Sequence, residues 1–476
     1  MRIGLIDRAV LVLAPERALP RIRARKQAEV LMNYDGASTG RRTSTLTARG
    51  TDADAALRRA APKLRMRARD QVRNRAYATR GVSVITSHVV GSGVVASVQC
   101  QDDAAKLALQ SLIKEHLQTT FIDARGALNL AGIQRIAMRT VVVDGEVFLR
   151  RRYRSGAYRR DLPLPFQIEM IEADQLDTSA TTHKDNRVQD GIEYGPTGAA
   201  VAYHFLSEHP GSDAFPRSSR KTTRVPAQDV IHIRRIDRPG QMRGVSWLSP
   251  VMLDLQELSD YHEAEGVKQK MASLFAGVVE REMTEEPGAS GERENKTIED
   301  LAPGAVVELE PGQKVQWTQN PDVRSLDPMT RISLRRIAGG LGITYESLSG
   351  DLSGTNYSSI RAGRIEMDQN VDDWQQELMI AQLGAGVARW FKEAIDLDPR
   401  TASVSLPWSM VWTPPARAMI DPTKDIGAWI KEIDAGLNSR RRRIRQMGRD
   451  PDTIENERQE DRQADRHLDA AEPPQE

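Results

Sequence analysis

The stretch from Gly342 to Trp374 most constrains the fold, because a short polar loop there stands directly before a long helical pattern. Ser, Gly, Asn and Thr crowd between Ser347 and Ser359, a composition that resists regular structure. After Tyr357, apolar residues return every three or four positions, which predicts a helix continuing to about Ile395. Such a helix would have about 40 residues and a length of roughly 60 Å. Helices of this length usually span an assembly.

Length and charge limit the classes of protein to consider. A chain of 476 residues predicts about three domains, or one elongated protein with a large interface. The formal net charge of +1 excludes a polycation of the histone type, so any contact with DNA must be local. Charge is distributed unevenly: residues 1–80 contain 19 Lys and Arg against 7 Asp and Glu, and residues 277–312 contain 3 against 10.

The single cysteine, Cys100, excludes an intramolecular disulfide and a multi-cysteine zinc site, as expected for a reducing cytosol. The apolar run Ala9–Ala14 is interrupted by Pro15 and is too short for a signal peptide or a membrane span. We therefore expect a soluble intracellular product that does not contact a membrane.

A basic, Ala- and Arg-rich arm opens the chain and extends to about Arg59. Blocks of like charge commonly act as interaction tails, so a solvated or assembly-docking arm and a DNA-binding arm both remain open. From Pro62 to about Leu117 the sequence is typical of helices, apart from the Val-rich piece Gly81–Gln99.

Three strand-like runs follow, at Ile133–Tyr153, Phe166–Leu176 and Gly191–Ser207. Within the first run, the pair Asp144-Gly145 stands between apolar residues and predicts a β-hairpin, because Gly supplies the positive φ that the turn needs. This half of the chain is predicted to be a mixed α+β domain.

The second half is predicted to be dominated by helices. One helix is expected over Pro250–Phe275, and another begins after Pro328. Between them lies an acidic region, Val278–Asn320, with strand candidates at Val306–Glu310 and Lys314–Trp317. The predicted fold class is therefore α+β and rich in helices.

Motifs for enzymes are absent or weak in the sequence. No GxxxxGK[ST] motif is present to hold a triphosphate, and Gly91–Ala96 fits a dinucleotide motif only in its glycine spacing. His262-Glu263 lacks the second histidine of a zinc protease motif and fits a polar helix face better. A Tyr357 nucleophile with Arg361 would lack the surrounding framework of a DNA-cutting enzyme. We predict no catalytic residues, no cofactor and no metal site.

Three long blocks carry a family resemblance: Ile231–Glu265, the loop and helix from Gly342 to Trp374, and Ile420–Ile454. In these blocks, and over nearly its whole length, the chain resembles the lambda-like portal proteins of tailed phages. The resemblance implies a twelve-fold ring at one capsid vertex of the virion, assembled in the host bacterial cytoplasm. Double-stranded DNA would be packaged, retained and ejected through it.

The resemblance also implies a portal-type architecture, with a mixed α/β wing, a two-helix stem, a small β-containing clip, a long wing helix and a helical C-terminal crown. The implied boundaries are 1–60 for the basic N-terminal arm, 61–245 for the first part of the wing, 246–276 for the stem helix, 277–322 for the clip, 323–341 for the returning stem helix, 342–356 for the tunnel loop, 357–415 for the long wing helix and closing segment, and 416–476 for the crown and C-terminal tail.

The implied partners are further copies of the chain, double-stranded DNA bound without sequence preference, the terminase large subunit, a head-completion or adaptor protein, and the major capsid or scaffolding protein. The acidic clip would dock the terminase first and the head-completion protein later. Two other classes of function stay open: a nucleic-acid-processing enzyme, and a head-tail adaptor without a packaging role.

The candidates for contact with DNA in the channel come from the returning helix and the tunnel loop. They are Arg324, Arg331, Arg335, Arg336, Tyr345, Thr355 and Asn356. Guanidinium groups can bind phosphates without reading bases. The alternative for the arginines is a salt bridge within the helix, since Asp327 stands four residues before Arg331, or between subunits. The alternative for Thr355 or Asn356 is to cap the following helix.

The densest basic cluster is predicted to lie in the crown, which by resemblance faces the packaged DNA. It consists of Arg440, Arg441, Arg442, Arg443 and Arg445. A solvated helix face or a charge network between subunits is the alternative.

Overall fold

The computed structural model describes residues 50–179, 181–214, 221–274, 278–281, 313–316, 326–398, 407–417, 419 and 421–471. The chain divides into two compact units, Met1–Asp52 and Ala53–Glu476, and every described helix and strand belongs to the second. Most of the predicted basic arm, the strand candidate Val306–Glu310 and Arg324 lie outside the described residues.

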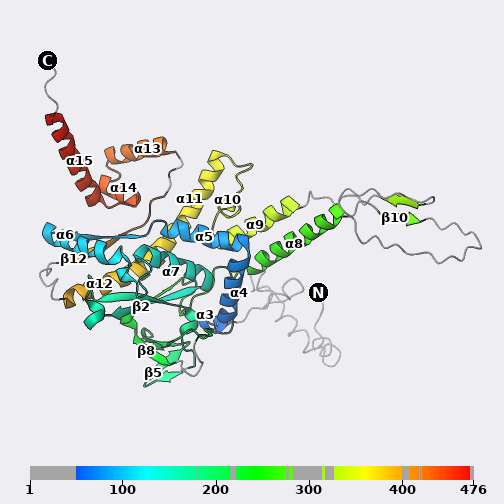
Figure 1. The fold of residues 1–476 in the computed structure, drawn as a ribbon, viewed down its shortest axis with the longest axis horizontal. Helices are drawn as coiled ribbons and strands as arrows, with labels where there is room; N and C mark the ends of the chain where they lie inside the picture. Colours follow the sequence, from blue (N-terminus) through cyan, green and yellow to red (C-terminus); the bar gives the residue numbers. More distant parts are fainter. Residues whose placement is uncertain are drawn as a thin grey trace, which may run out of the picture. The chain divides into compact units, whose positions relative to one another are not determined.

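The second unit is an α+β structure rich in helices, as the sequence predicts (Figure 1). Its α-helices are α3 (Ala53–Leu57), α4 (Ala61–Asn74), α5 (Ala76–Val90), α6 (Asp103–Leu112), α7 (Leu130–Asp144), α8 (Met252–Leu274), α9 (Leu326–Leu341), α10 (Tyr345–Ser349), α11 (Tyr357–Trp374), α12 (Ala385–Leu397), α13 (Pro422–Asp434), α14 (Arg440–Gln446) and α15 (Pro451–Ala471). Two π-helical segments are η2 (Ile113–Leu117) and η9 (Gln375–Gly384), and short 3-10 turns are η3 (Thr120–Ile122), η4 (Gly156–Arg159), η5 (Ala173–Gln175) and η7 (Ala227–Asp229).

The described strands form four small sheets. The strands are β1 (Val95–Cys100), β2 (Glu146–Tyr153), β3 (Phe166–Ile171), β4 (Thr182–His183), β5 (Asn186–Gln189), β6 (Ile192–Tyr194), β7 (Ala200–Leu206), β8 (Thr222–Pro226), β9 (Val230–Arg234), β10 (Val278–Arg281), β11 (Gln313–Gln316) and β12 (Trp408–Thr413). They pair in the orders β1-β12, β10-β11, β3-β2-β9 and β4-β5-β6-β7-β8, and every pairing is antiparallel.

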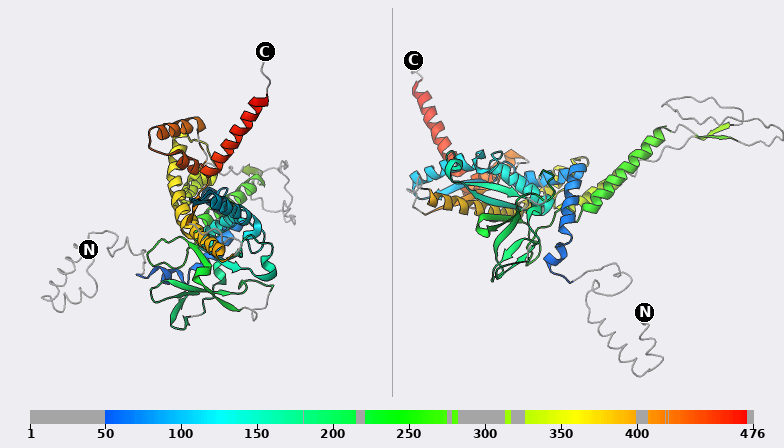
Figure 2. Two further views of the ribbon diagram at one scale, coloured as in Figure 1. Left: turned by 90° about the vertical axis from the view of Figure 1, so that its left-hand side faces the viewer. Right: turned by 60° about the horizontal axis from the view of Figure 1, so that its bottom comes forward.

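One large apolar core joins the helices to the three-stranded sheet. Helix α7 packs against β2 and β9, and η9 packs against β9 as well. Helix α5 contacts both α7 and η9, so helices distant in sequence share this core (Figure 1, Figure 2). Trp247 and Trp374 meet there with ring centroids 4.8 Å apart. A second, smaller core around Phe148 and Phe205 joins the three-stranded sheet to the five-stranded one.

Two predictions for the first half are wrong. The Val-rich piece is helical up to Val90 within α5, and only Val95–Cys100 forms a strand, β1. Asp144-Gly145 is not a hairpin: Asp144 ends α7, and Gly145, with a φ of 95°, is its left-handed C-cap. Burial explains α5, since five of its Val and Ile side chains lie in the core, and packing overrides their preference for strands.

The predicted helix pair of the second half is confirmed as α8 and α9, which lie side by side (Figure 1, Figure 2). Strand β11 confirms the candidate at Lys314–Trp317 within one residue, and it pairs with β10, which the sequence analysis did not predict. His262 Nε2 and Thr330 Oγ1 form a hydrogen bond of 2.8 Å between the two helices, consistent with the polar role expected for His262.

The long helix predicted after Tyr357 is confirmed as a continuous run of α11, η9 and α12, from Tyr357 to Leu397. Its middle is π-helical, which the sequence analysis did not foresee. Gln375, at the start of this wider segment, is buried and its side chain donates 2.9 Å to the backbone oxygen of Val89 in α5. Among the described residues, no helix has both the length and the apolar character needed to cross a membrane.

Candidate nucleic-acid interface

The segment between α9 and α11 is more ordered than its composition predicts. Gly342, with a φ of 71°, ends α9, and Thr344 caps the short helix α10 by accepting a hydrogen bond of 3.2 Å from the Ser347 backbone nitrogen. Leu348 of α10 is buried, and α10 packs against α5 and α9. The predicted irregular loop 342–356 is therefore corrected: residues 345–349 form a helix, and residues 342–344 and 350–356 lack a helix or strand.

Asp351 holds the remaining loop together. It accepts a hydrogen bond of 3.0 Å from the Tyr345 hydroxyl and others from the backbone and side chain of Ser353. Burial, and then the hydrogen bond to the Asp351 carboxylate, raise the pKa of Tyr345. Asp351 was not among the residues predicted from the sequence, because only the turn at Gly350, with a φ of 74°, brings it back beside Tyr345.

The two residues at the end of the loop have local structural roles. Asn356 caps α11 in a reciprocal capping box, accepting 2.8 Å from the Ser359 nitrogen and donating 3.1 Å to the Ser359 hydroxyl. Thr355 instead donates 2.7 Å from its hydroxyl to the Leu352 carbonyl oxygen. The capping alternative is thus confirmed for Asn356. Leu352, Ser353 and Gly354 form an exposed run within the loop.

The structure brings three of the channel candidates together and separates a fourth. Arg335 lies 5.5 Å from the centroid of the Tyr345 ring, and Arg331 lies 3.8 Å from the Asp351 carboxylate. Arg331 also pairs with Asp327 at 3.1 Å, which confirms the predicted salt bridge within the helix. Arg336 points elsewhere and pairs at 2.8 Å with Asp254 of α8.

The C-terminal basic cluster lies on α14, which Ser439 caps by accepting 3.1 Å from the Arg442 nitrogen. Two of its five arginines are neutralised within the chain, since Arg441 pairs with Asp452 and Arg443 pairs with Glu432. Arg443 also lies 5.2 Å from the Trp429 ring. Arg440 and Arg442 are exposed, and Arg445 is half-buried. The cluster thus offers less free positive charge than its sequence suggests.

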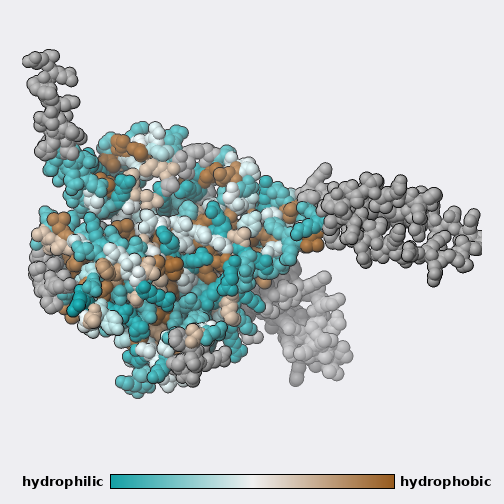
Figure 3. Space-filling model, viewed as in Figure 1, coloured by the Kyte–Doolittle hydropathy of each residue, from teal (hydrophilic) through white to brown (hydrophobic). Residues whose placement is uncertain are grey.

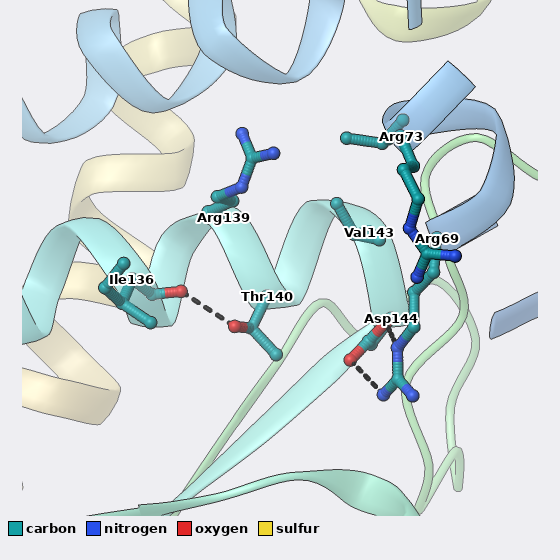
Figure 4. A pocket seen from close by; sticks show the side chains of 8 residues that line it. Arg69, Arg73, Ile136, Arg139, Thr140, Val143 and Asp144 are labelled. Atoms are coloured by element: carbon teal, nitrogen blue, oxygen red, sulfur yellow. Dashed lines mark hydrogen bonds and ion pairs between the residues drawn. The ribbon is translucent and has the colours of Figure 1, made fainter. Parts of the chain in front are cut away.

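A further basic groove, not predicted from the sequence, lies between α4 and α7 (Figure 4). It has a volume of about 440 Å³, and Arg69, Arg73 and Arg139 contribute to its walls. Arg69 makes a two-pronged contact with Asp144, with nitrogen to oxygen distances of 2.8 and 2.6 Å. The groove was missed because Arg139 stands in the run Ile133–Tyr153, which was predicted to be a strand with a hairpin and is helical up to Asp144.

The neighbouring carboxylates form an ion-pair network. Glu172, Asp174 and His209 place possible ligand atoms within 4.8 Å of one another, as a metal site would require. Arg69, however, pairs with Glu172 at 3.0 Å and with Asp174 at 2.7 Å. Arg65 adds a further pair with Asp174 at 3.1 Å. Guanidinium groups therefore already provide the positive charge that these carboxylates need.

A buried carboxylate fixes the segment that leads into α8. Glu146 is fully buried; it pairs with Arg243 at 2.6 Å and with His232 at 2.9 Å, and accepts 3.0 Å from the Gly244 nitrogen. Burial alone would raise the pKa of Glu146, but Arg243 and His232 hold it well below its usual range. Burial, aided by Arg234, lowers the pKa of His232 to about 3, so His232 is neutral.

Residues 39–375 match the family profile described as phage portal proteins of the lambda family. The chain is 27% identical over 463 residues to a probable portal protein of Halomonas phage phiHAP-1, covering 92% of this chain and 88% of that one. It is 22% identical over 436 residues to portal protein B of Escherichia phage lambda, covering 81% and 80% of the two chains.

A chain in the neck of an empty gene transfer agent (GTA) particle has a similar fold. The TM-score is 0.50 at 12% identity, and the match covers 84% of this chain and 95% of that chain. At this identity the likeness concerns the fold alone. The family match spans the mixed α+β body, the pair α8 and α9, and the whole of α11, and the relatives extend it over most of the chain. The chain therefore belongs to the lambda family of phage portal proteins.

Proposed function

We propose that copies of this chain form a closed ring at one vertex of a phage capsid, and that double-stranded DNA passes through its channel during packaging and ejection. The match to the lambda portal family over residues 39–375 carries this proposal. A ring of twelve copies is proposed from the family. The protein acts structurally, as a component of the virion, and another protein supplies the packaging motor.

The segment 350–356 is proposed to face the DNA as a tunnel loop. Its exposed part, Leu352 to Gly354, has no charged side chain, and the nearby Arg331 is paired with Asp327 and Asp351. A duplex that slides needs weak contacts, because many tight phosphate contacts would arrest it. Rotational symmetry repeats each weak contact around the ring and confines the duplex without reading its sequence. Arg335, which is exposed beside Tyr345, is the proposed phosphate contact at this level.

The ends of the ring are proposed to bind different partners. The clip, residues 277–322, is proposed to dock the terminase large subunit and later a head-completion protein. Its first part, 277–312, has 3 Lys and Arg against 10 Asp and Glu. The exposed Arg440 and Arg442 of α14 are proposed to face packaged DNA in the crown. The major capsid or scaffolding protein would surround the wing.

Negative-stain imaging of the purified full-length chain tests the ring. The expected result is a ring with a central hole, and a compact monomer under every condition tried would contradict the proposal. Particles assembled without this protein distinguish the portal from an adaptor, because a portal is required for encapsidated DNA and an adaptor is not.

Removal of residues 352–354 tests the tunnel loop. These three residues are exposed, whereas Leu348 and Asp351 nearby hold α10 and the loop. Rings are expected to form normally, and DNA packaging or retention is expected to fall. Replacement of Ser179 and Thr181 by Ala, in the exposed segment that leads into β4, is the control. Loss of rings would show instead that the loop is an assembly element.

A further inference from the structure

The helices α8 and α9 leave apolar side chains on the surface of the chain. Leu253 and Val267 of α8 are 73% and 50% exposed, and Met329 and Ile332 of α9 are 50% and 55% exposed. Figure 3 shows apolar residues at the surface on the side of the molecule where α8 and α9 lie. Two large apolar residues exposed on each of two neighbouring helices indicate a surface that is covered in the assembled protein.

On α8 the exposed residues follow one line along the helix. The outer stripe of α8 consists of Leu253, Glu257, Asp260, Ala264 and Val267, all of which are exposed. Their spacing alternates between four and three residues, which is the spacing of a seam between two packed helices. Apolar residues stand at both ends of the stripe and two carboxylates stand in its middle.

On α9 a second line has the same kind of spacing and the opposite charge. The outer stripe of α9 consists of Met329, Ile332, Arg336 and Gly339, separated by three, four and three residues, and all four are exposed. The Arg336 side chain stays 67% exposed although it pairs with Asp254. A Cβ at Gly339 would meet no atom within 4 Å, so a second helix could approach the backbone there.

Apart from the pair of Arg336 with Asp254, the contact between α8 and α9 within one chain uses other residues. Leu255 and Leu258 of α8 and Leu334 and Ile337 of α9 are buried in the large core. The hydrogen bond between His262 and Thr330 also lies on this inner side. Within the described part of the chain, the apolar side chains of the two outer stripes are therefore left to solvent.

We infer that the outer stripe of α8 in one copy packs against the outer stripe of α9 in the next copy. One stripe is apolar and acidic, the other apolar and basic, so they complement each other but not themselves. A contact between two different patches repeats head to tail, and it closes into a ring when the rotation allows. The inference rests on the proposed ring and names the surfaces that build it.

The inference gives Arg336 a role different from the channel contact predicted from the sequence. Its guanidinium lies near Asp254 in its own chain and would meet Glu257 or Asp260 of the neighbour. Arg335, which lies beside Tyr345, is not part of the stripe and keeps its proposed place at the channel.

Charge reversal tests the contact in the full-length protein. The charge of the α8 stripe is reversed by Glu257→Arg with Asp260→Arg, and the charge of the α9 stripe is reversed by Arg336→Glu. Either reversal places like charges opposite each other, so the fraction of chains in rings should fall about tenfold or more. Combining the reversals should restore the ring fraction to within about threefold of the wild type, since the charges again match. The ring fraction is measured by mass photometry and negative-stain imaging at equal concentration and salt.

Matched variants separate the interface from folding. Asp254→Asn removes the partner of Arg336 within the chain and leaves both stripes unchanged, and Asp185→Arg reverses an exposed charge on the turn between β4 and β5. Both should leave the ring fraction within about threefold of the wild type. Leu253→Ser should lower it about tenfold, whereas Leu107→Ser, at a residue 66% exposed on α6, should not.

The outcomes also distinguish this inference from the proposed function. If the wild type forms rings and both reversals leave the ring fraction at the wild-type level, the contact between α8 and α9 of neighbouring copies is wrong. The proposed portal ring is then still supported. The same holds if both reversals abolish rings and their combination restores none while circular dichroism shows folded chains. If the wild type forms no rings, the proposed function itself fails.

Discussion

At the scale of single residues, the buried Glu146 joins separate segments of the chain. Its carboxylate ties β2 to β9 through His232 and to the segment before α8 through Arg243 and Gly244. A buried carboxylate is stable only when cations and hydrogen bonds replace its lost hydration. The sequence did not reveal this site, because its members lie between 86 and 98 residues from Glu146 and only the paired strands bring them together.

Glu146→Gln should destabilise the fold strongly. The amide keeps the shape of the side chain but leaves the buried Arg243 without its charge partner, which typically costs about 3–5 kcal/mol. Chemical denaturation followed by circular dichroism measures the loss. Glu169→Gln is the control: its partner Arg152 is 38% exposed and surface pairs contribute under about 1 kcal/mol. Equal losses in the two variants would show that Glu146 does not hold the junction.

His116 should make stability depend on pH. It is fully buried against Phe166, with ring centroids 4.9 Å apart, and burial lowers its pKa from 6.5 to about 3. Between those values the unfolded chain binds a proton and the folded chain does not, so stability is lost as the pH falls below 6.5. The loss should reach about 2 kcal/mol near pH 5.

Replacing His116 by Phe removes this titration. From pH 7 to pH 5, the His116→Phe variant should lose about 2 kcal/mol less stability than the wild type. His209→Phe is the comparison, because His209 lies at the surface beside Glu172. Parallel pH profiles for wild type and His116→Phe would rule out a buried neutral histidine.

At the scale of helices and strands, the sequence predicted where a regular element lies more readily than whether it is a helix or a strand. The pattern after Tyr357 predicted the long helix because buried positions such as Met367, Val371 and Leu378 recur at helical spacing. Gly145 shows the limit: its positive φ was predicted, yet a hairpin and a helix C-cap both use it. Nothing local to Asp144-Gly145 separates the two, whereas the capping of α7 by Asn129 and its packing on β2 decide for the helix.

The candidate channel site was predictable in the same partial way. Arg331, Arg335 and Tyr345 were predicted separately as channel contacts, and they lie together because only a few residues separate α9 from α10. The sequence did not place Arg336 against α8, which depends on the packing of two helices separated by the acidic segment. Ordered turns at Gly342 and Gly350 also gave the loop more structure than its composition suggests.

The close passage of two backbones at Gly145 and Gly244 gives a prediction for the start of α8. A Cβ on Gly244 would lie 2.1 Å from the Gly145 carbonyl oxygen, so Gly244→Ala must push the two segments apart. We expect a loss of about 2 kcal/mol or more. Gly427→Ala in α13, where a Cβ meets nothing within 4 Å, should instead stabilise its helix by about 0.5–1 kcal/mol. Thermal unfolding of both variants measures the difference in sign.

At the scale of the whole molecule, the distribution of charge along the chain was more informative about function than its length or its net charge. A formal net charge of +1 hides an acidic segment at 277–312 and a stripe of α9 that is basic. In a head-to-tail ring such separation is an advantage, since unlike surfaces of the same chain meet at every interface. The family was identifiable from long blocks of sequence, whereas the surfaces that meet between subunits needed the exposure of each helix face.

Ring assembly should accordingly depend on salt. If unlike charges meet between α8 and α9, raising the ionic strength from about 0.1 M to 1 M shortens the screening length from about 10 Å to about 3 Å. Rings of the wild type should then dissociate more readily at low protein concentration. The variant that combines Glu257→Arg, Asp260→Arg and Arg336→Glu should respond in the same way, because its interface also joins unlike charges. A ring fraction that rises steadily with salt would show that apolar contact alone dominates the interface.

The contacts between α8 and α9 within the chain also bear on how such proteins diversify. The pairs Asp254 with Arg336 and His262 with Thr330 fix the two helices to each other before the chain reaches the segment between Leu274 and Leu326. That segment can then change in length and sequence while the body receives the chain at the same two points. A change of the proposed docking partner would therefore require changes in this one segment, with the rest of the chain kept.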